Sequence, residues 1–272
     1  MSTAADARYR LHRRFDRMGR LVGDDAMRRL FESHVMVIGL GGVGSFAAEA
    51  LARAGVGKLT LVDFDVVCVT NANRQIQALR GNIGKPKATV MAERIRLINP
   101  QIEAKAVPLF YDARIADQLL RNDVDFVVDA IDNITAKCHL LAACRTAQKP
   151  VVCSTGASGR MDPCQVEVAD LAHTRVDPLA QSVRKILRQK HDFPSQGPWN
   201  IPGVFSTEPL AKPAELHYDQ GRGFECVCPS GDNEHHTCDD RNIIWGTAGF
   251  VTGAFGLACA SVVVRTLTTG GN

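Results

Sequence analysis

The chain has 272 residues, of which 45% are hydrophobic and 22% are charged, and its formal net charge is +3. These values predict a packed globular core in one large α/β domain, or in one such domain with a modest extension. The charge is too small to indicate nucleic-acid binding by itself, so any such binding has to be inferred from the local distribution of basic residues. Nine cysteines without a recognisable signal peptide favour the reducing cytoplasm over a disulfide framework.

Apolar runs alternate with helical patterns over the first part of the chain. The apolar runs lie at 35–38, 59–62, 124–128 and 150–153, and the helical patterns at 45–54, 86–98, 113–121 and 134–147. Gln165–Ala169 adds a polar and apolar alternation, as in a half-exposed strand. This succession predicts a Rossmann-like, doubly wound α/β fold with a mostly parallel sheet and a C-terminal extension.

The whole chain, 1–272, is predicted to form a single domain with three parts. These parts are an N-terminal helical arm at 1–34, a core at 35–170, and a final part at 171–272 that holds a basic segment, a loop and a C-terminal helix. Glycine and proline cluster between Pro194 and Gly223, which predicts a long irregular connection there.

The last predicted helix runs from near Gly246 to near Thr266. Segment 243–264 contains no charged residue and is long enough to span a bilayer, so a membrane-spanning helix is one alternative. Its small residues make it less apolar than a leucine-rich span and let helices pack closely; they include Gly246, Gly249, Gly253 and Gly256. We favour a buried helix of a soluble protein, in a core or a subunit interface, without stable membrane association.

A glycine-rich turn follows the first predicted strand. Gly39, Gly41, Gly42 and Gly44 stand in the spacing Gly-x-Gly-x-x-Gly. This spacing lets a strand turn tightly into a helix and leaves backbone N–H groups exposed to a phosphate. Asp63 closes the next apolar strand, where a ribose-binding carboxylate belongs. By itself, this pattern fits any mononucleotide or dinucleotide, and it makes 35–170 a nucleotide-binding core.

Basic and amide residues behind Asp63 narrow the choice of nucleotide. Asn71 and Arg74 follow it, and Lys87 opens the helix that begins near Pro86. An arginine and a lysine at one phosphate site fit a nucleotide whose terminal phosphates are displaced, because the cations neutralise charge on a leaving pyrophosphate. NAD needs little such charge, which disfavours a dehydrogenase. The structural alternatives are a helix-capping Asp63 and an Arg74 that is only a surface charge.

The order of these motifs resembles the adenylation domain of ubiquitin-activating and sulfur-carrier adenylyltransferase enzymes. The residues that carry the resemblance are the glycine turn, Asp63-Phe-Asp65, Asn71-x-x-Arg74-Gln, Gly84-x-Pro86-Lys87 and Asp129-Ala-Ile-Asp132-Asn133. The resemblance implies that the nucleotide is ATP and that Asp63 binds its ribose.

The same resemblance assigns the predicted catalytic residues. It places Asn71, Arg74 and Lys87 on the triphosphate, and it implies that Asp132 holds Mg²⁺ near the reacting phosphate. Arg74, Lys87 and Asp132 are therefore the predicted catalytic group. For Asp65 and Asp129, supporting or strand-end roles stay open beside ligand roles.

The region after residue 150 is similar to the tRNA threonylcarbamoyladenosine dehydratase branch of this superfamily. The matching residues are Ser154-Thr-Gly-Ala-Ser-Gly-Arg-Met-Asp162-Pro163, Asp170-Leu-Ala, Asp177-Pro-Leu-Ala180, Val204-Phe-Ser-Thr-Glu208 and Val251-Thr-Gly-Ala-Phe-Gly256, with Arg14-Phe and Arg20-Leu-Val-Gly23 near the N-terminus. The similarity implies adenylation of a threonyl carboxylate beside the tRNA anticodon, then attack by the neighbouring carbamoyl group. Such an intramolecular attack needs no enzyme nucleophile.

The similarity also implies a homodimer. In the family, an N-terminal arginine reaches the ATP phosphates of the partner subunit. Arg20 is the preferred match because of its Arg-Leu-x-Gly context, and Arg17 is the alternative. A cysteine desulfurase or another sulfur-acceptor system is a further candidate partner.

Basic residues gather between His173 and His191. They are Arg175, Arg184, Lys185, Arg188 and Lys190, against the single carboxylate Asp177. Part of this segment is predicted to form a helix whose basic face contacts tRNA phosphates. The alternative is an ordinary solvated helix.

The cysteines bear on the choice between an RNA-modifying enzyme and an enzyme that activates a carrier protein. No Cys-x-x-Cys pair exists, whereas carrier-activating relatives generally hold zinc with such pairs. Apolar sequence contexts favour a place in the core for Cys68, Cys138, Cys144, Cys153 and Cys259. Cys226, Cys228, His235, His236 and Cys238 supply zinc-ligand types at a tight spacing, and a disordered or substrate-facing loop is the alternative. An adenylyltransferase for a ubiquitin-like sulfur carrier and a non-catalytic nucleotide-binding scaffold stay as alternative functions.

Overall fold

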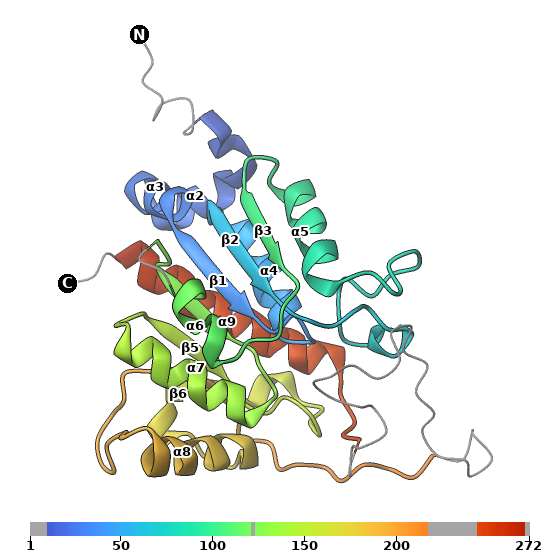
Figure 1. Ribbon diagram of the computed structural model, residues 1–272. Coiled ribbons are helices and arrows are strands. Elements are labelled where there is room, and N and C mark those ends of the chain that lie inside the picture. Colours follow the sequence, from blue (N-terminus) through green and yellow to red (C-terminus); the bar gives the residue numbers. More distant parts are fainter. Residues whose placement is uncertain (1–9, 121–122, 217–243, 270–272) are drawn as a thin grey trace.

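The computed structural model describes residues 10–120, 123–216 and 244–269. Within these residues, one seven-stranded sheet has the order β3-β2-β1-β4-β5-β7-β6 (Figure 1). The strands are β1 (His34–Ile38), β2 (Lys58–Val62), β3 (Glu103–Val107), β4 (Phe126–Asp129), β5 (Val151–Ser154), β6 (Val166–Asp170) and β7 (Pro202–Ser206). All neighbouring strands are parallel except β6 and β7. The predicted doubly wound, mostly parallel α/β fold is therefore confirmed.

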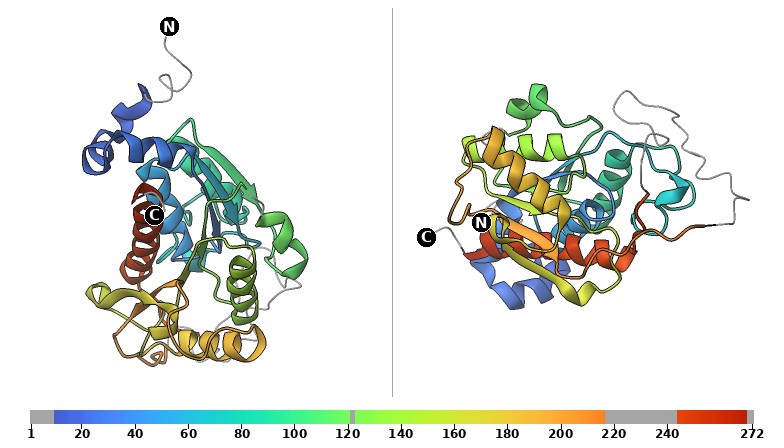
Figure 2. Two further views of the ribbon diagram at one scale, coloured as in Figure 1. Left: turned by 90° about the vertical axis from the view of Figure 1, so that its left-hand side faces the viewer. Right: turned by 90° about the horizontal axis from the view of Figure 1, so that it is seen from below.

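Helices cover both faces of the sheet (Figure 2). They are α2 (Asp16–Val22), α3 (Asp24–Glu32), α4 (Gly44–Ala54), α5 (Lys87–Ile98), α6 (Ala113–Leu119), α7 (Ile134–Thr146), α8 (Pro178–Lys190) and α9 (Gly249–Thr269), with short 3-10 helices at Arg10–Phe15, Val69–Asn71, Pro163–Gln165 and Leu171–His173. Helices α3, α4, α5 and α9 share one apolar core with the sheet, and α6, α7 and α8 share the other.

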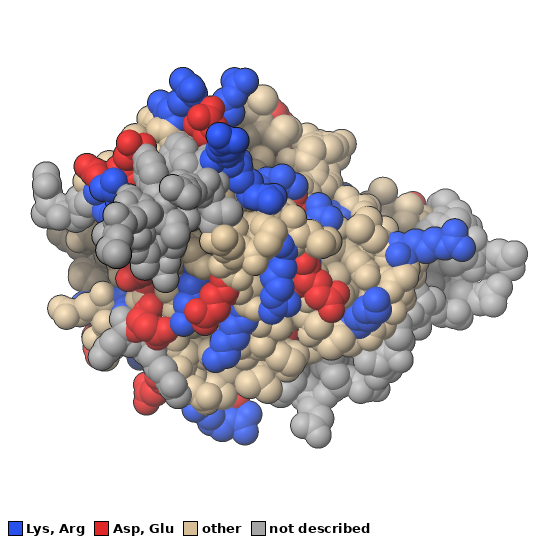
Figure 3. All heavy atoms as spheres, turned by 90° about the horizontal axis from the view of Figure 1, so that it is seen from above, with Lys and Arg blue, Asp and Glu red and all other residues tan. Residues whose placement is uncertain are grey.

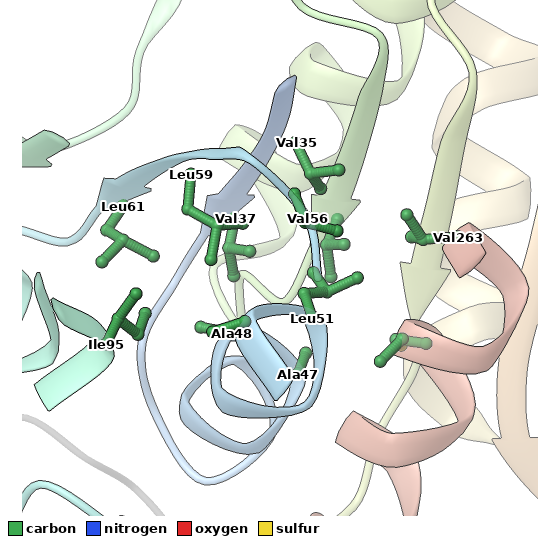
Figure 4. Close-up of a cluster of buried hydrophobic side chains, with 14 of the residues drawn as sticks. Val35, Val37, Ala47, Ala48, Leu51, Val56, Leu59, Leu61, Ile95 and Val263 are labelled. Carbon is green, nitrogen blue, oxygen red and sulfur yellow. The ribbon is translucent and has the colours of Figure 1, made fainter. Parts of the chain in front are cut away.

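Strand β1 shows why both faces need a cover. All five of its residues are buried. Val35 and Val37 point to the core that α4 and α9 close, where Leu51 and Val263 meet them (Figure 4). Met36 and Ile38 belong to the other core. Because alternate side chains of a strand point to opposite faces, a continuous apolar run predicts a central strand that is buried on both sides.

The sequence patterns do not predict two of the strands. Strand β3 contains two alanines, a glutamate and a lysine, which favour strands weakly, and it lies at the edge of the sheet. The predicted irregular connection between Pro194 and Gly223 is wrong in part, because β7 lies in it and pairs with both β5 and β6. Strand β7 begins with Pro202 and Gly203, which are rare in strands, so its sequence does not indicate a strand. Proline is nevertheless tolerated at the first residue of a strand.

Helix α9 crosses the face of the sheet that α4 also covers (Figures 1 and 2). A Cβ atom on Gly256 would lie 2.4 Å from the Val43 carbonyl oxygen, so glycine lets the two helices pack closely. The helix is long and apolar enough to cross a membrane, but 50% of its most apolar stretch is buried inside the protein. This half-buried packing is consistent with the buried helix that we expected, although the helix begins at Gly249 rather than near Gly246; residue 243 lies outside the described residues.

The order of the strands reverses next to β1. The chain passes from β1 to β2 on one side, whereas β4 pairs with β1 on the other side. The loops at the carboxyl ends of β1 and β4 therefore lead away in opposite directions and leave a crevice between them. In open α/β sheets, ligands bind at this switch point.

Candidate nucleotide-binding site

A cavity of about 830 Å³ lies at the carboxyl ends of β1, β2, β4 and β5. Every predicted nucleotide-binding residue lines it except Gly44 and Arg20. The structure therefore brings together residues from Gly39 to Asp132, which are far apart in the sequence. The motifs named from the sequence form one site at the switch point of the sheet.

The glycine turn follows β1 and faces the cavity. Gly39 has a φ of +88°, a left-handed conformation that favours glycine. A Cβ atom on Gly39 would lie 2.6 Å from the Ala130 carbonyl oxygen, and one on Gly44 would lie 1.7 Å from the Gly39 carbonyl oxygen. Gly44 thus serves the close approach of α4 to the strand rather than contact with a ligand, while Gly41 and Gly42 line the cavity.

Asp63 connects the end of β2 to this glycine turn. One of its carboxylate oxygens accepts a hydrogen bond from the Leu40 N–H at 2.6 Å, and the other accepts one from the Asp65 N–H at 2.8 Å. Neither donor belongs to a helix, so the helix-capping alternative is wrong. Burial raises the pKa of Asp63. Asp63 therefore fixes the shape of the turn as well as lining the cavity.

Lys87 is a buried cation at the first position of α5. Its Nζ lies 2.8 Å from an Asp65 carboxylate oxygen, and its side chain is 7% exposed. Burial acts to lower the pKa of Lys87, but the surrounding carboxylates of Asp63, Asp65 and Asp132 raise it overall. Lys87 therefore keeps its charge at neutral pH. Asp65, whose role the sequence leaves open, is its ion-pair partner.

Asn71 and Arg74 approach the cavity from the loop between β2 and α5. The Asn71 side-chain oxygen accepts a hydrogen bond from the Cys68 N–H at 3.0 Å, which fixes the loop. The Arg74 guanidinium donates to the Thr70 carbonyl oxygen at 2.9 Å and to the Asn73 side chain at 3.1 Å. These contacts hold Arg74 on the cavity wall, where it is partly exposed.

The two aspartates after β4 differ in environment. Asp132 is exposed and lines the cavity. Asp129 is completely buried, and one of its oxygens lies 2.7 Å from Lys137 Nζ. Asp129 does not line the cavity, so it is a structural strand-end carboxylate and not a ligand. The sequence reasoning missed Lys137, because a lysine inside a helical pattern resembles a surface residue.

Two buried ion pairs hold the opposite wall of the cavity, formed by residues 154–158. At one end, Lys137 Nζ donates to the Ser154 carbonyl oxygen at 2.9 Å. At the other end, Arg160 pairs with Asp177 at 2.9 Å, and Arg160 also donates to the Gly156 carbonyl oxygen. Asp177 caps α8 by accepting the Ala180 N–H at 2.6 Å. The sequence reasoning gave Arg160 and Asp177 no such role.

The remaining predicted residues lie away from the cavity. Arg20 is exposed on α2 and pairs with Asp16 at 2.9 Å, so it does not reach the cavity of its own chain. Arg184 donates to the Thr174 hydroxyl, Arg175 pairs with Glu167 at 3.0 Å, and Arg188 lies 5.2 Å from the centre of the Trp199 ring. Lys185 and Lys190 are exposed on α8. The residues considered for zinc, Cys226, Cys228, His235, His236 and Cys238, lie outside the described residues.

This arrangement defines a class of protein. A doubly wound sheet with a glycine turn, a buried aspartate and two cations at its switch point is an α/β nucleotide-binding protein suited to phosphate chemistry. The chain belongs to the ThiF family, whose model matches residues 15–272.

Dehydratases of two bacteria are similar to this chain. The chain is 40% identical over 257 residues to the tRNA threonylcarbamoyladenosine dehydratase of Haemophilus influenzae, with 93% of each chain covered. It is 42% identical over 256 residues to the Escherichia coli protein of that name, covering 93% of this chain and 92% of the other. The crystal structure of the E. coli dehydratase TcdA with ATP matches with a TM-score of 0.81 at 38% identity, covering 99% of this chain and 97% of that one. A complex of TcdA with AMP matches equally well.

Proposed function

We propose that this protein is an ATP-dependent tRNA threonylcarbamoyladenosine dehydratase. The observation that carries the proposal is the cavity at the switch point, in which Arg74, Lys87 and Asp132 meet the glycine turn. Dehydratases of this name match along 93% of the chain, so the support extends beyond the nucleotide-binding core. The reaction is ligase-like, because ATP activates a carboxylate.

The chemistry proceeds in two steps. First, a threonyl carboxylate oxygen bonds to the α-phosphorus of ATP, the bond from that phosphorus to the bridging oxygen breaks, and pyrophosphate leaves. Then the neighbouring carbamoyl group bonds to the acyl carbon, AMP departs with the carboxylate oxygen, and the carbamoyl nitrogen loses a proton. The sum is loss of one water molecule. Because both reacting groups belong to one nucleoside, the ring closes without a nucleophile from the enzyme.

Arg74 and Lys87 serve the first step. Negative charge grows on the leaving pyrophosphate, and cations that are already in place stabilise that charge. Lys87 is already oriented by Asp65, so it loses little freedom when phosphates arrive. Asn71 and the glycine turn position the phosphates, and Asp63 lies where the ribose binds.

Mg²⁺ fits the donors at this site. Among the described residues, no group of three or more His, Cys, Asp or Glu side chains is arranged to hold a metal ion. Mg²⁺ commonly binds through one or two carboxylates together with substrate phosphates, and the exposed Asp132 on the cavity wall supplies such a carboxylate. Bound there, the ion would neutralise phosphate charge beside Lys87.

Helix α8 is the part of the chain that we propose for tRNA contact. It contains four basic residues and no acidic residue, whereas the face at the opposite end of the molecule mixes basic and acidic side chains (Figure 3). Leu179 in its first turn lines the cavity. At the helical rise of 1.5 Å per residue, Arg184 and Arg188 lie roughly 8 and 14 Å further along the axis. Phosphates next to a nucleotide in the cavity would therefore meet this helix.

A homodimer would complete the site. Arg20 is exposed and distant from its own cavity, and we propose that it reaches the ATP phosphates of the partner subunit. Helix α9 leaves apolar side chains on the surface, with Phe250 56% exposed and Leu257 54% exposed; such side chains suit a subunit interface. Five of the six described cysteines are buried free thiols, as expected for a cytoplasmic protein.

Pyrophosphate release tests the proposal. The purified protein with ATP and Mg²⁺ should release pyrophosphate when tRNA carrying threonylcarbamoyladenosine is added, and should not respond to tRNA without that modification. Release that depends on a carrier protein ending in diglycine would instead support the adenylyltransferase alternative. If neither substrate causes pyrophosphate release, the alternative of a non-catalytic nucleotide-binding scaffold remains.

A further inference from the structure

The cavity has two unlike halves. One half holds Asp63, Lys87 and Arg74, together with aromatic and aliphatic side chains that follow β2 and β3. The other half is formed by residues 154–158, Leu179 and residues 244–247. The cavity volume of about 830 Å³ lies in the upper part of the range of about 300–1,000 Å³ that is usual for small-molecule sites. If ATP occupies the half that carries the cations, the second half is open to the other substrate.

Thr155 in the second half has an unsatisfied hydroxyl. Its backbone N–H donates to the Val204 carbonyl oxygen at 2.9 Å, which ties it to β7. The residue is 6% exposed, and its side-chain oxygen is buried without a hydrogen-bond partner. A buried hydroxyl without a hydrogen-bond partner destabilises the folded protein, because it gives up its hydrogen bonds to water. A threonine at the cavity wall is therefore explained if a polar group of a ligand completes the bond.

Trp245 lies on a short segment that crosses the cavity wall. The Gly159 N–H donates to the Gly246 carbonyl oxygen at 2.8 Å, and the Asn73 side chain donates to the Thr247 carbonyl oxygen at 2.8 Å. The segment is thus held from both sides of the cavity, next to the start of α9. The Trp245 side chain lines the cavity and stays 37% exposed. A partly exposed indole on a segment whose backbone is held in this way is a suitable surface for stacking a base.

We propose that this second half of the cavity receives the threonylcarbamoyl-modified adenine of the RNA, with the base stacked on Trp245 and the threonyl group hydrogen-bonded to the Thr155 hydroxyl. The inference rests on the proposed function and adds the residues that select the substrate. The two buried ion pairs, Lys137 with Asp129 and Arg160 with Asp177, hold the wall that carries Thr155. That wall is rigid before substrate arrives, so little ordering is required on binding.

Fluorescence reports on Trp245 directly. The chain contains two tryptophans, and Trp199 is buried against Phe193. In a Trp199→Phe parent, with excitation that tyrosine does not absorb, the emission therefore comes from Trp245 alone. Titration of a short anticodon stem-loop carrying threonylcarbamoyladenosine should quench that emission, and the same stem-loop with plain adenosine should quench it less. Equal emission with and without the modified stem-loop would contradict the stacking.

Kinetics on two matched pairs of variants complete the test. Trp245→Leu should raise the KM for the modified RNA about fivefold to 150-fold, as for the loss of one stacked base, and Trp245→Phe should change it little. Thr155→Val should lower kcat/KM for the RNA by about tenfold, and Thr155→Ser should keep most of it. If the hydroxyl were only structural, Thr155→Val would raise the melting temperature and leave kcat/KM unchanged.

Turnover by the unaltered protein separates this inference from the proposed function. If the unaltered protein does not convert the modified RNA, the proposed function fails. If it converts the RNA while the Trp245→Leu and Thr155→Val variants keep the same kcat/KM, the function stands and the subsite assignment is wrong.

Discussion

Lys87 and Asp65 line the cavity and form an ion pair, with Nζ 2.8 Å from the carboxylate oxygen. The pair orients the cation, and the three nearby carboxylates keep it charged. The protein therefore holds a positive charge ready where phosphate charge would develop.

Replacement of Lys87 by Met should reduce ATP-dependent turnover by about a hundredfold or more, since the charge that meets the leaving pyrophosphate is lost. Arg74→Ala should act in the same direction, and its partly exposed position makes a folding defect less expected. Lys85→Met is the matched control, because Lys85 is exposed two residues earlier, and it should keep its activity. Circular dichroism melting verifies the fold of each variant. Normal turnover by a folded Lys87→Met protein would show that the nucleotide site is assigned wrongly.

Charge reversal on α8 should weaken tRNA binding. Changing Arg184, Lys185 and Arg188 to Glu should lower the affinity and reduce the slope of log affinity against log salt by about one for each lost phosphate contact. Filter binding over a range of salt concentrations measures both. The affinity for ATP should stay the same.

The control for this variant carries the same change in charge elsewhere. Arg28, Lys105 and Arg114 are exposed on other elements, and their replacement by Glu should leave the salt slope nearly unchanged. If both triple variants behave alike, only net charge matters, and α8 is an ordinary solvated helix.

Mixed dimers test whether Arg20 acts on the partner subunit. Arg20→Ala and Lys87→Met proteins should each be inactive, and subunits mixed and re-equilibrated should recover up to about a quarter of the normal activity, since half of the dimers then contain one intact site. An arginine that acts within its own chain would give no recovery. The same experiment with Arg17→Ala decides between the two arginines.

His34 should make the stability depend on pH. Burial lowers the pKa of His34 below its ordinary value of 6.5, and its ring nitrogens lie 2.9 Å from the Asp123 carbonyl oxygen and 2.8 Å from the Thr60 hydroxyl. The unfolded chain therefore takes up the proton first, so the free energy of unfolding should fall as the pH drops from about 7.5 to about 5. Urea unfolding of the protein and of His34→Gln should show a weaker pH dependence in the variant; equal slopes would assign the effect to other groups.

The local motifs of the sequence predict most of the fold. Gly39 and Gly44 mark the turn after β1, and Pro86 marks the start of α5, because steric demands act on neighbouring residues. Strand β7 could not be predicted in this way. It lies inside the sheet only because β5 and β6 pair with it, and Pro202 with Gly203 gives no local sign of a strand.

The residues of the site also differ in whether the sequence predicts them. Asp63, Arg74 and Lys87 belong to motifs with fixed spacing, so their convergence could be expected. Lys137 and Arg160 could not, because a charged residue is buried only when a distant partner compensates it. Their partners, Asp129 and Asp177, are known only once the chain is folded.

The mass of the modified nucleoside gives the most direct test of the proposed function. tRNA that carries threonylcarbamoyladenosine is incubated with the protein, ATP and Mg²⁺, then digested to nucleosides under mild conditions and analysed by mass spectrometry. We predict a nucleoside lighter by one water molecule, which appears with ATP and not with an analogue whose bridge between the α- and β-phosphates cannot be cleaved, and which the Lys87→Met protein does not form. An unchanged threonylcarbamoyladenosine mass in the presence of folded, ATP-binding protein would contradict the proposed function.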